Sequence, residues 1–363
     1  MRNFLKFDWV MFTVVTLLLI IGLLILYSIS TEGDVLNSDQ FYHQFLAICV
    51  GIFLMMALAL LDYRTLNIYS TKFYFVALII LAAVLFFGTT VRGTTGWIGF
   101  ESFHIQPVEG VKIILIIFLA SFLSKKKTKL KESVKIIVSI VLVAVPVFLI
   151  LKQPDFGSAS IVAGIWCGML FVSGINKKNL LVLFMIFTVV AGSGYFLLKD
   201  YQKERLINFI KPYNDPRGSG YNVIQSVVAV GSGGIFGKGL GHGSQSQLNF
   251  LPEKHTDFIF AVLAEELGLA GSLMAIFLFG VLLYKIKKTA SLARDNFGYL
   301  LVIGVMIMFF LQIFINIGMN IGLNPVAGVP LPLLSYGGSS MISILASLGI
   351  VQSVYLRRVQ TLD

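Results

Sequence analysis

The first apolar run of the chain, residues 9–30, reads WVMFTVVTLLLIIGLLILYSIS and contains no charged residue. A helix of about 20 apolar residues crosses the hydrocarbon core of a bilayer, so this run is long enough to span it. It is too long for the core of a secretory signal and lacks a small-residue cleavage site, which predicts a retained span. Similar runs recur along the chain, and the expected spans are approximately 9–30, 42–61, 73–88, 108–124, 134–151, 158–175, 179–198, 258–284, 297–320 and 335–356.

The composition of the whole chain favours the same interpretation. Hydrophobic residues make up 57% of the 363 positions and charged residues only 13%, whereas an ordinary soluble domain has about 25% charged residues. This excludes a soluble globular protein, a disordered chain and a disulfide-stapled secreted domain. The apolar runs are unbroken, which is not the alternating pattern of a membrane β-barrel. We therefore expect one all-α polytopic membrane domain over residues 1–363, with about ten transmembrane helices.

The basic residues set the expected orientation. Short loops on one side carry most of the lysines and arginines, including KKK at 125–127, whereas the short loops on the other side carry Arg92 and Lys152. Cytoplasmic loops of membrane proteins collect positive charge. We expect both termini in the cytoplasm and a long outer loop, about 199–256, between the seventh and eighth spans. The net charge of +10 follows from this topology, so no nucleic-acid partner is expected.

The long outer loop is rich in glycine and contains the stretch GSGGIFGKGLG at 231–241. Glycine lets a backbone approach a ligand closely, and successive amides can hold an anion. A flexible linker is the alternative. A nucleotide-binding P-loop is excluded, because Ser232 and Gly239 occupy positions where that motif requires glycine and a hydroxyl residue. Residues 222–230 predict a short amphipathic helix at the outer interface.

A pair of opposite charges begins the fourth span. Glu109 and Lys112 are three residues apart, which places them on one face of a helix. Burying a charge in a membrane is costly, so such residues need a partner or a polar surrounding. The pair either forms a structural ion pair or lines a polar cavity that opens outward.

Two acids lie where outer loops meet spans. Asp155, in the turn QPDFGS at 153–158, either caps the sixth span or contributes to a site. Asp257 lies at the start of the eighth span. There either Thr256 or Asp257 caps the helix, or Asp257 is a partly desolvated carboxylate able to accept a proton.

Further polar residues lie within the later spans. Glu265 and Glu266 stand two turns into the eighth span, where one of them is expected to pair with another buried polar group. Asn316 and Asn320 share one face of the ninth span and are expected to hydrogen-bond between helices. The proline-rich loop at 324–340 is expected to form a stiff wall of an outer cavity or a structural lid.

Taken together, these motifs resemble the SEDS family of peptidoglycan polymerases, which includes RodA, FtsW and SpoVE. The GHGSQSQLNFLPEKHTDF stretch, 241–258, is more similar to the elongation branch, RodA, than to the division branch. Val108 and Gly110 depart from the commoner family pattern, but the charged pair is kept. The matching segments run in family order over essentially the whole chain: WIGFESFHIQPVEGVK (97–112), QPDFGSA (153–159), NDPRGSGYNVIQS (214–226), VGSGGIFGKGLGHG (230–243), LPEKHTDFIFAVLAEELG (251–268), NIGMNIGLNPVAGVPLP (316–332) and SYGGSS (335–340).

The resemblance implies a glycosyltransferase of the cytoplasmic membrane that polymerises lipid II into β-1,4-linked glycan strands on the outer face, for cell elongation. It implies lipid II as substrate, a class B penicillin-binding protein as cross-linking partner, and the elongation machinery. A division-specific polymerase and a lipid II flippase are the alternatives. A flippase needs polar groups that reach the inner face, whereas the unusual charges here cluster at the outer half. A non-catalytic scaffold would tolerate Asp257→Asn, and a polymerase would not.

The resemblance also implies roles for individual residues. The donor sugar is α-linked and the product β-linked, so one inverting displacement suffices. It needs a base for the acceptor hydroxyl and positive charge for the departing diphosphate, with a divalent cation, Mg²⁺ or Mn²⁺, left open. We expect catalytic roles for Asp257, Glu109 and Lys112, and substrate contacts for Lys112, Arg92, Asp155, Arg205, Gln225, His255 and Ser335.

Overall fold

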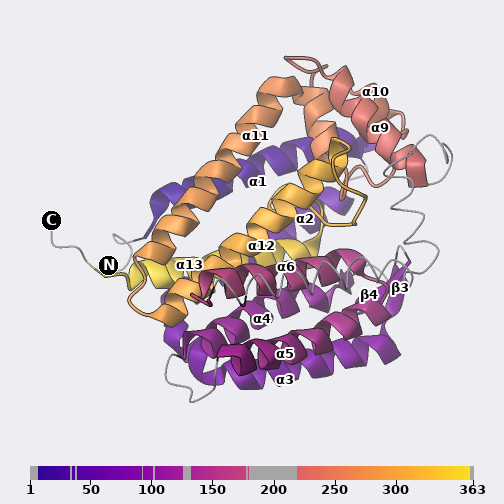
Figure 1. Cartoon of the computed structure of the whole chain (residues 1–363). Coiled ribbons are helices and arrows are strands. Elements are labelled where there is room, and N and C mark those ends of the chain that lie inside the picture. The colour runs from indigo at the N-terminus through magenta and orange to yellow at the C-terminus, as the bar shows by residue number, and fades with distance from the viewer. Residues whose placement is uncertain are drawn as a thin grey trace.

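A computed structural model of the chain describes residues 7–32, 35–36, 39–91, 93–100, 103–125, 132–176, 179 and 219–359. Within these ranges the fold is a helical bundle (Figure 1), and eight of its helices are long and apolar enough to cross a membrane. They are α1 (Trp9–Ser30), α2 (Asp39–Leu60), α3 (Tyr63–Phe87), α4 (Pro107–Ser124), α5 (Glu132–Lys152), α11 (Ile259–Ser291), α12 (Asn296–Asn320) and α13 (Gly338–Leu356). The shorter apolar helix α6 (Phe156–Val172) packs among them.

Each expected span other than 179–198 coincides with one of these helices, which confirms the polytopic helical class. The expected span 179–198, apart from its first residue, and the first part of the long loop, 199–218, lie outside the described residues. The largest difference is α3, which begins at Tyr63 rather than at residue 73. Its first turns are polar, and Asp62 caps them by accepting the amide of Arg64 at 2.9 Å.

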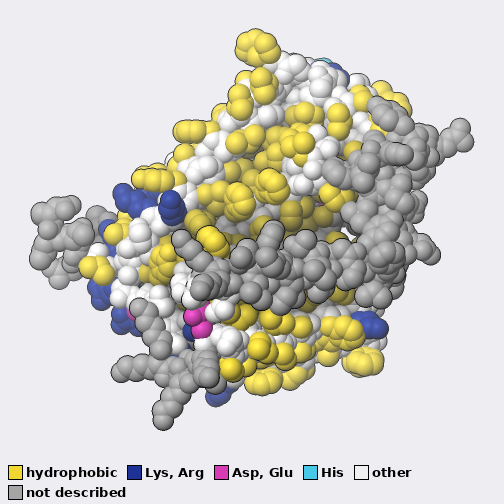
Figure 2. Space-filling model, in the orientation of Figure 1, with side chains coloured by type: hydrophobic (Ala, Val, Ile, Leu, Met, Phe, Trp, Pro, Cys, Tyr) yellow, Lys and Arg dark blue, Asp and Glu magenta, His cyan; other side chains and the backbone are white. Residues whose placement is uncertain are grey.

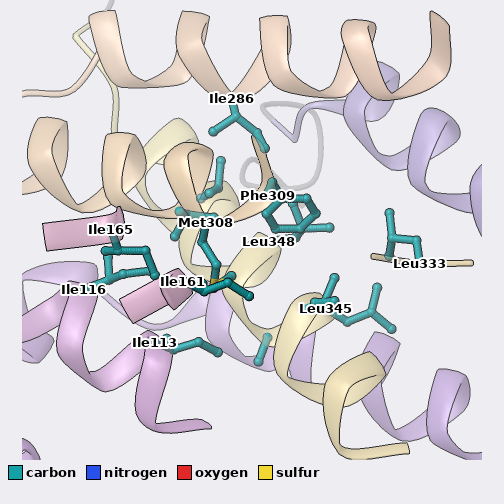
Figure 3. Close-up of a cluster of buried hydrophobic side chains, with 14 of the residues drawn as sticks. Ile113, Ile116, Ile161, Ile165, Ile286, Met308, Phe309, Leu333, Leu345 and Leu348 are labelled. Atoms are coloured by element: carbon teal, nitrogen blue, oxygen red, sulfur yellow. The ribbon is translucent and has the colours of Figure 1, made fainter. Parts of the chain in front are cut away.

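The core lies where α4, α6, α12 and α13 meet, and Figure 3 shows buried hydrophobic side chains from all four helices gathered there. Lipid tails are as apolar as leucine, so helices in a membrane associate largely through close packing at small residues. Gly304 on α12 illustrates this, because a Cβ there would lie 2.5 Å from Cγ2 of Ile116 on α4. Gly349 on α13 likewise packs on α2, where a Cβ would meet the Met55 carbonyl at 2.5 Å.

Short strands occur in two of the segments that connect the helices, although an all-α fold was expected. Strands β3 (Thr89–Val91), β4 (Thr94–Phe100) and β5 (Phe103–Ile105) form an antiparallel sheet in that order. This sheet lies at the end of the bundle opposite the two termini (Figure 1). It docks on the turn before α6, where the Thr95 amide donates to the Gln153 carbonyl at 3.3 Å. A two-residue pairing, β1 (Thr31–Glu32) with β2 (Val35–Leu36), follows α1.

The described part of the long loop contains two helices, α9 (Ser219–Ser232) and α10 (Ser244–Gln247). Helix α9 confirms the short helix expected at 222–230 and extends it at both ends. It packs against α11 and α12. The described part of the loop is therefore a folded layer over the ends of these helices.

The glycine-rich stretch after α9 packs against a break in α11. The break is at Gly268, whose φ is 67°, a conformation that favours glycine. The amide of Lys238 donates to the carbonyl of Glu265 at 3.0 Å, so the loop satisfies a group near the break. A Cβ on Gly237 would lie 2.1 Å from the Glu266 carbonyl oxygen. These glycines therefore permit a close approach of loop and helix backbones.

Hydrophobic side chains cover much of the face shown in Figure 2, and Lys and Arg gather there mainly near the two termini. Unpaired polar backbone is costly in lipid, and one proline within α5 shows how the fold avoids it. Pro146 has no amide to donate to the Leu142 carbonyl, and the Tyr74 hydroxyl of α3 donates to that oxygen instead, at 2.7 Å.

Candidate active site

Three loops that are far apart in the sequence enclose one cavity of about 160 Å³. They are the QPDFGS turn, the turn 251–258 that precedes α11, and the loop 324–340 between α12 and α13. The sheet containing β4 contributes a further wall through Trp97. The cavity is lined by Thr94, Trp97, Gln106, Pro154, Asp155, Phe156, Thr256, Asp257, Ala327, Gly328, Pro330, Tyr336, Gly337, Gly338, Ser339 and Ser340.

Asp257 lies in the cavity wall immediately before α11. The N-cap of α11 is Phe258, so neither Thr256 nor Asp257 is the cap residue that the sequence suggested. Gly328, whose φ is 66°, faces the acid closely, because a Cβ at that position would lie 3.7 Å from Oδ2 of Asp257. The absence of a side chain at Gly328 keeps the space beside this carboxylate open.

The turn that carries Asp257 is tied to the loop before α13. The Ser335 hydroxyl donates to the Thr256 carbonyl at 2.6 Å and accepts the Leu331 amide at 2.8 Å. The Tyr336 amide donates to the His255 carbonyl at 2.9 Å. Ser335 is buried and holds backbone in place, and neither Ser335 nor His255 is among the residues that line the cavity.

Asp155 caps α6 and also lines the cavity, so both roles left open by the sequence coincide. Its Oδ1 accepts the Ser158 amide at 2.9 Å, and its Oδ2 accepts Nε2 of Gln106 at 3.2 Å. The backbone amide of Gln106 donates to Oγ of Ser339 at 2.9 Å. One hydrogen-bonded chain thus joins the starts of α6, α4 and α13.

Glu109 and Lys112 form an ion pair of 2.7 Å, with side chains that are only 4% and 1% exposed. Gln106, just before α4, lines the cavity. At a rise of 1.5 Å per residue, Glu109 and Lys112 lie about 4.5 and 9 Å further along the helix axis. The pair is not among the cavity-lining residues. The ion pair expected from the sequence is therefore present, and it lies beneath the site rather than in its wall.

The charge of the described cavity wall is negative. Asp155 and Asp257 line it, and the described lining contains no lysine or arginine. Arg92 and Arg205, both expected to contact the diphosphate, lie outside the described residues. Within the described ranges, no group of three or more His, Cys, Asp and Glu side chains comes together as a candidate metal site.

Gln225, also expected at the site, lies half-buried on α9 and is not among the lining residues. The next residue, Ser226, donates its hydroxyl to the Asn320 carbonyl at 2.8 Å. Helix α9 therefore contacts the end of α12, which itself supports the turn containing Asp257.

Glu265 and Glu266 hold the glycine-rich loop and are fully buried. Glu265 accepts Nζ of Lys238 at 2.8 Å and the amide of Ser246 at 3.0 Å. Glu266 accepts the hydroxyl of Ser28, from α1, at 2.6 Å. The partner expected for one of these acids is thus present for both. The anions held by the loop amides are the protein's own carboxylates.

Several lining residues were not predicted. Gln106, Trp97, Tyr336 and Ser339 all lie inside the motifs quoted above, but none was singled out. The signal available was a tryptophan and a tyrosine in polar segments between the spans. Such a ring has an apolar face and a hydrogen-bonding group at its edge. Their convergence depends on tertiary packing and is not visible in the spacing of the sequence.

A family model described as a cell cycle protein, covering FtsW, RodA and SpoVE, matches residues 8–359. The chain belongs to the FtsW/RodA/SpoVE family. The matched residues include all the described spans and each loop that encloses the cavity. The match confirms the family that the motifs indicated.

Named relatives cover nearly the whole chain. The peptidoglycan glycosyltransferase MrdB of Escherichia coli (strain K12) is 37% identical over 94% of this chain and 93% of its own. Stage V sporulation protein E of Bacillus subtilis (strain 168) is 37% identical over 96% of each chain. A solved chain, described under structural coordination of polymerization and crosslinking by a peptidoglycan synthase complex, matches with a TM-score of 0.82. It is 33% identical and covers 98% of this chain and 99% of its own.

Proposed function

We propose that this protein is a peptidoglycan glycosyltransferase that polymerises lipid II into glycan strands. The observation that carries the proposal is the convergence of five of the quoted family motifs on one cavity, with Asp257 in its wall. The whole-length relative MrdB is named for this activity. The 363 residues act as a single membrane domain, since one buried apolar cluster runs from α1 to α13.

The proposed reaction is one inverting displacement at the anomeric carbon of the donor. Asp257 takes the proton of the acceptor hydroxyl as the new C–O bond forms. The bond to the diphosphate breaks, and the diphosphate leaves with the electron pair. A positioned base contributes about 10²–10⁴-fold to such a step.

The developing charge on the diphosphate needs positive groups. We assign this role to Arg205 and Arg92, which the sequence places in outer segments, because the described wall supplies none. Lys112 and Glu109 do not line the cavity. Their buried ion pair stabilises the start of α4, where Gln106 contributes to the cavity wall. Mg²⁺ or Mn²⁺ remains an optional addition, for which Asp155 and Asp257 are the described carboxylates at the cavity.

The cavity is proposed to open on the outer face of the cytoplasmic membrane, with both termini inside. Asp257 lies just before the start of α11, whereas the last turns of this helix carry Lys285, Lys287 and Lys288. The start of α4 likewise enters the cavity, and Lys125 follows its end. Since cytoplasmic ends collect positive charge, the cavity lies at the opposite, outer end.

A class B penicillin-binding protein of the elongation machinery is the proposed partner. One structurally similar chain comes from a study of how a peptidoglycan synthase complex coordinates polymerization and crosslinking. MrdB and the sporulation protein have the same identity to this chain, so identity does not separate branches of the family. The elongation role rests on the stretch 241–258, and a division role is the alternative.

The test is strand synthesis from purified lipid II in liposomes, with and without the partner, together with lipid II translocation in the same vesicles. A polymerase gives glycan strands that grow with time, with or without translocation. Translocation without strands, in the presence of a partner shown to bind, would replace the polymerase by a flippase. If the protein showed neither strand synthesis nor translocation, a non-catalytic scaffold would be the remaining function.

A further inference from the structure

The carboxamide of Asn320, at the end of α12, bridges two backbone groups around Asp257. Its Nδ2 donates to the Asp257 carbonyl at 2.9 Å, and its Oδ1 accepts the Ala261 amide at 3.0 Å. If α11 began one residue earlier, at Phe258, that amide would donate directly to that carbonyl, four residues back. The side chain is inserted where the first helical hydrogen bond would otherwise close.

This bridge also replaces a helix cap. The first amides of a helix have no partner within it, and a side-chain oxygen at the N-cap usually accepts one of them. The N-cap of α11, Phe258, makes no such bond. Oδ1 of Asn320 accepts the third amide of α11 instead, an amide that also donates to the Phe258 carbonyl at 3.0 Å. Asp257 directly precedes the N-cap, and its carboxylate is the natural competitor for this position. Asn320 therefore occupies the place that the Asp257 carboxylate would take.

Asn316, one turn earlier on α12, reinforces the arrangement. Its Nδ2 donates to the Asp257 carbonyl at 2.9 Å and to the Val329 carbonyl at 2.8 Å. Val329 follows Gly328, which faces the Asp257 carboxylate. The Asn316 amide thereby links the backbone on both sides of that carboxylate. Both asparagines are fully buried, so solvent does not compete for these bonds.

We infer that Asn320 and Asn316 are positioning residues for the Asp257 carboxylate: Asn320 caps α11 in its place, and Asn316 fixes its distance from the Gly328 wall. The inference rests on the proposed role of Asp257 as the base. Neither asparagine touches the cavity, because neither is among its lining residues. Their effect on the reaction is transmitted through the Asp257 backbone.

The test is Asn320→Ala, with kcat for strand synthesis and lipid II binding measured separately. Without the bridge, the first amides of α11 attract the Asp257 carboxylate, and a displacement of about 1 Å costs about 10²-fold in rate. We expect kcat to fall by about that factor while the dissociation constant and stoichiometry of lipid II binding stay at wild-type values. A loss of binding sites in proportion to the loss of rate would show a merely structural role and overturn the inference.

Two further variants keep the test independent of folding. Asn316→Ala leaves the cap and removes one of two donors to Asp257, so a smaller loss of kcat with unchanged binding is expected. Ser347→Ala removes a buried hydroxyl that donates only to its own helix, at Ile344, and is the matched control for losing a buried hydrogen bond. Unchanged kcat in Asn316→Ala and Asn320→Ala, with an active wild type, refutes the positioning role alone. A wild type that makes no strands instead refutes the proposed function.

Discussion

Replacing Gly157 by alanine should separate two walls of the cavity. A Cβ at Gly157 would lie 2.2 Å from the Ala327 carbonyl oxygen and 3.0 Å from Cγ2 of Val329. Because the nearest atom is backbone, no side-chain rotation relieves the overlap. An ordinary contact begins at 3.4 Å, so the α6 turn carrying Asp155 and the loop carrying Gly328 must move apart by roughly 1 Å.

The expected result is a loss of about 10²-fold in kcat for strand synthesis, the typical effect of a 1 Å displacement in a catalytic arrangement. Overpacking also costs about 1–3 kcal/mol of stability, which a thermal unfolding curve in detergent measures. The assay is strand synthesis at saturating lipid II, with the rate corrected for the folded fraction.

Gly110→Ala is the matched control, because a Cβ there meets nothing within 4 Å and the site lies on α4 near the same cavity. Alanine is favoured over glycine within a helix by about 1 kcal/mol, so this variant should be as stable as wild type or more so. A folded Gly157→Ala protein with the kcat of Gly110→Ala would refute the claim that these two walls set the geometry of the site.

Two other substitutions test the supports of the site by thermal unfolding. Lys112→Met leaves Glu109 charged and buried without its partner, which should cost about 3–5 kcal/mol, and the added change Glu109→Gln should recover most of it. Failure of the second change to recover stability would show that the pair is not coupled. Gly268→Ala places a Cβ 2.3 Å from the Gly237 amide nitrogen in a backbone with φ of 67° and should lower the unfolding temperature, whereas Gly280→Ala, with nothing within 4 Å, should not. Equal unfolding temperatures for the two alanine variants would contradict the role assigned to the break in α11.

The spans could be predicted because hydrophobicity is a local property of the chain and a bilayer fixes the length it requires. The asparagine pair on α12 was predictable for a similar reason, since a spacing of four residues places both on one helix face. Their acceptors were not, because the Asp257 and Val329 carbonyls come from two other segments.

The glycine-rich loop shows where the sequence was ambiguous. Glycines permit close approach to a ligand or to another backbone equally well, and only the break in α11 decides between them. Similarly, two of the three strands in the sheet at 89–105 have only three residues each and are too short to be recognised alone. Its pairing depends on docking against Gln153, which is distant in the sequence.

The site residues also differ in how much of their placement the sequence could predict. Asp257 and Asp155 line one cavity, as expected of a shared site, because each follows a turn at the same end of the bundle. Glu109 and Lys112 face each other instead, since a separation of three residues on α4 is short enough for a direct ion pair. Helix periodicity permits that contact but does not show which neighbouring helices bury it.

The most direct measurement of the central claim is kcat for glycan-strand synthesis by folded Asp257→Asn protein at saturating lipid II. Asp62→Asn is the control, an acid at the start of α3 whose capping bond to Arg64 an asparagine can keep. The account predicts normal lipid II binding by both variants, a wild-type rate for Asp62→Asn, and a loss of about 10²-fold or more for Asp257→Asn. Strand synthesis by Asp257→Asn at the wild-type rate would contradict it.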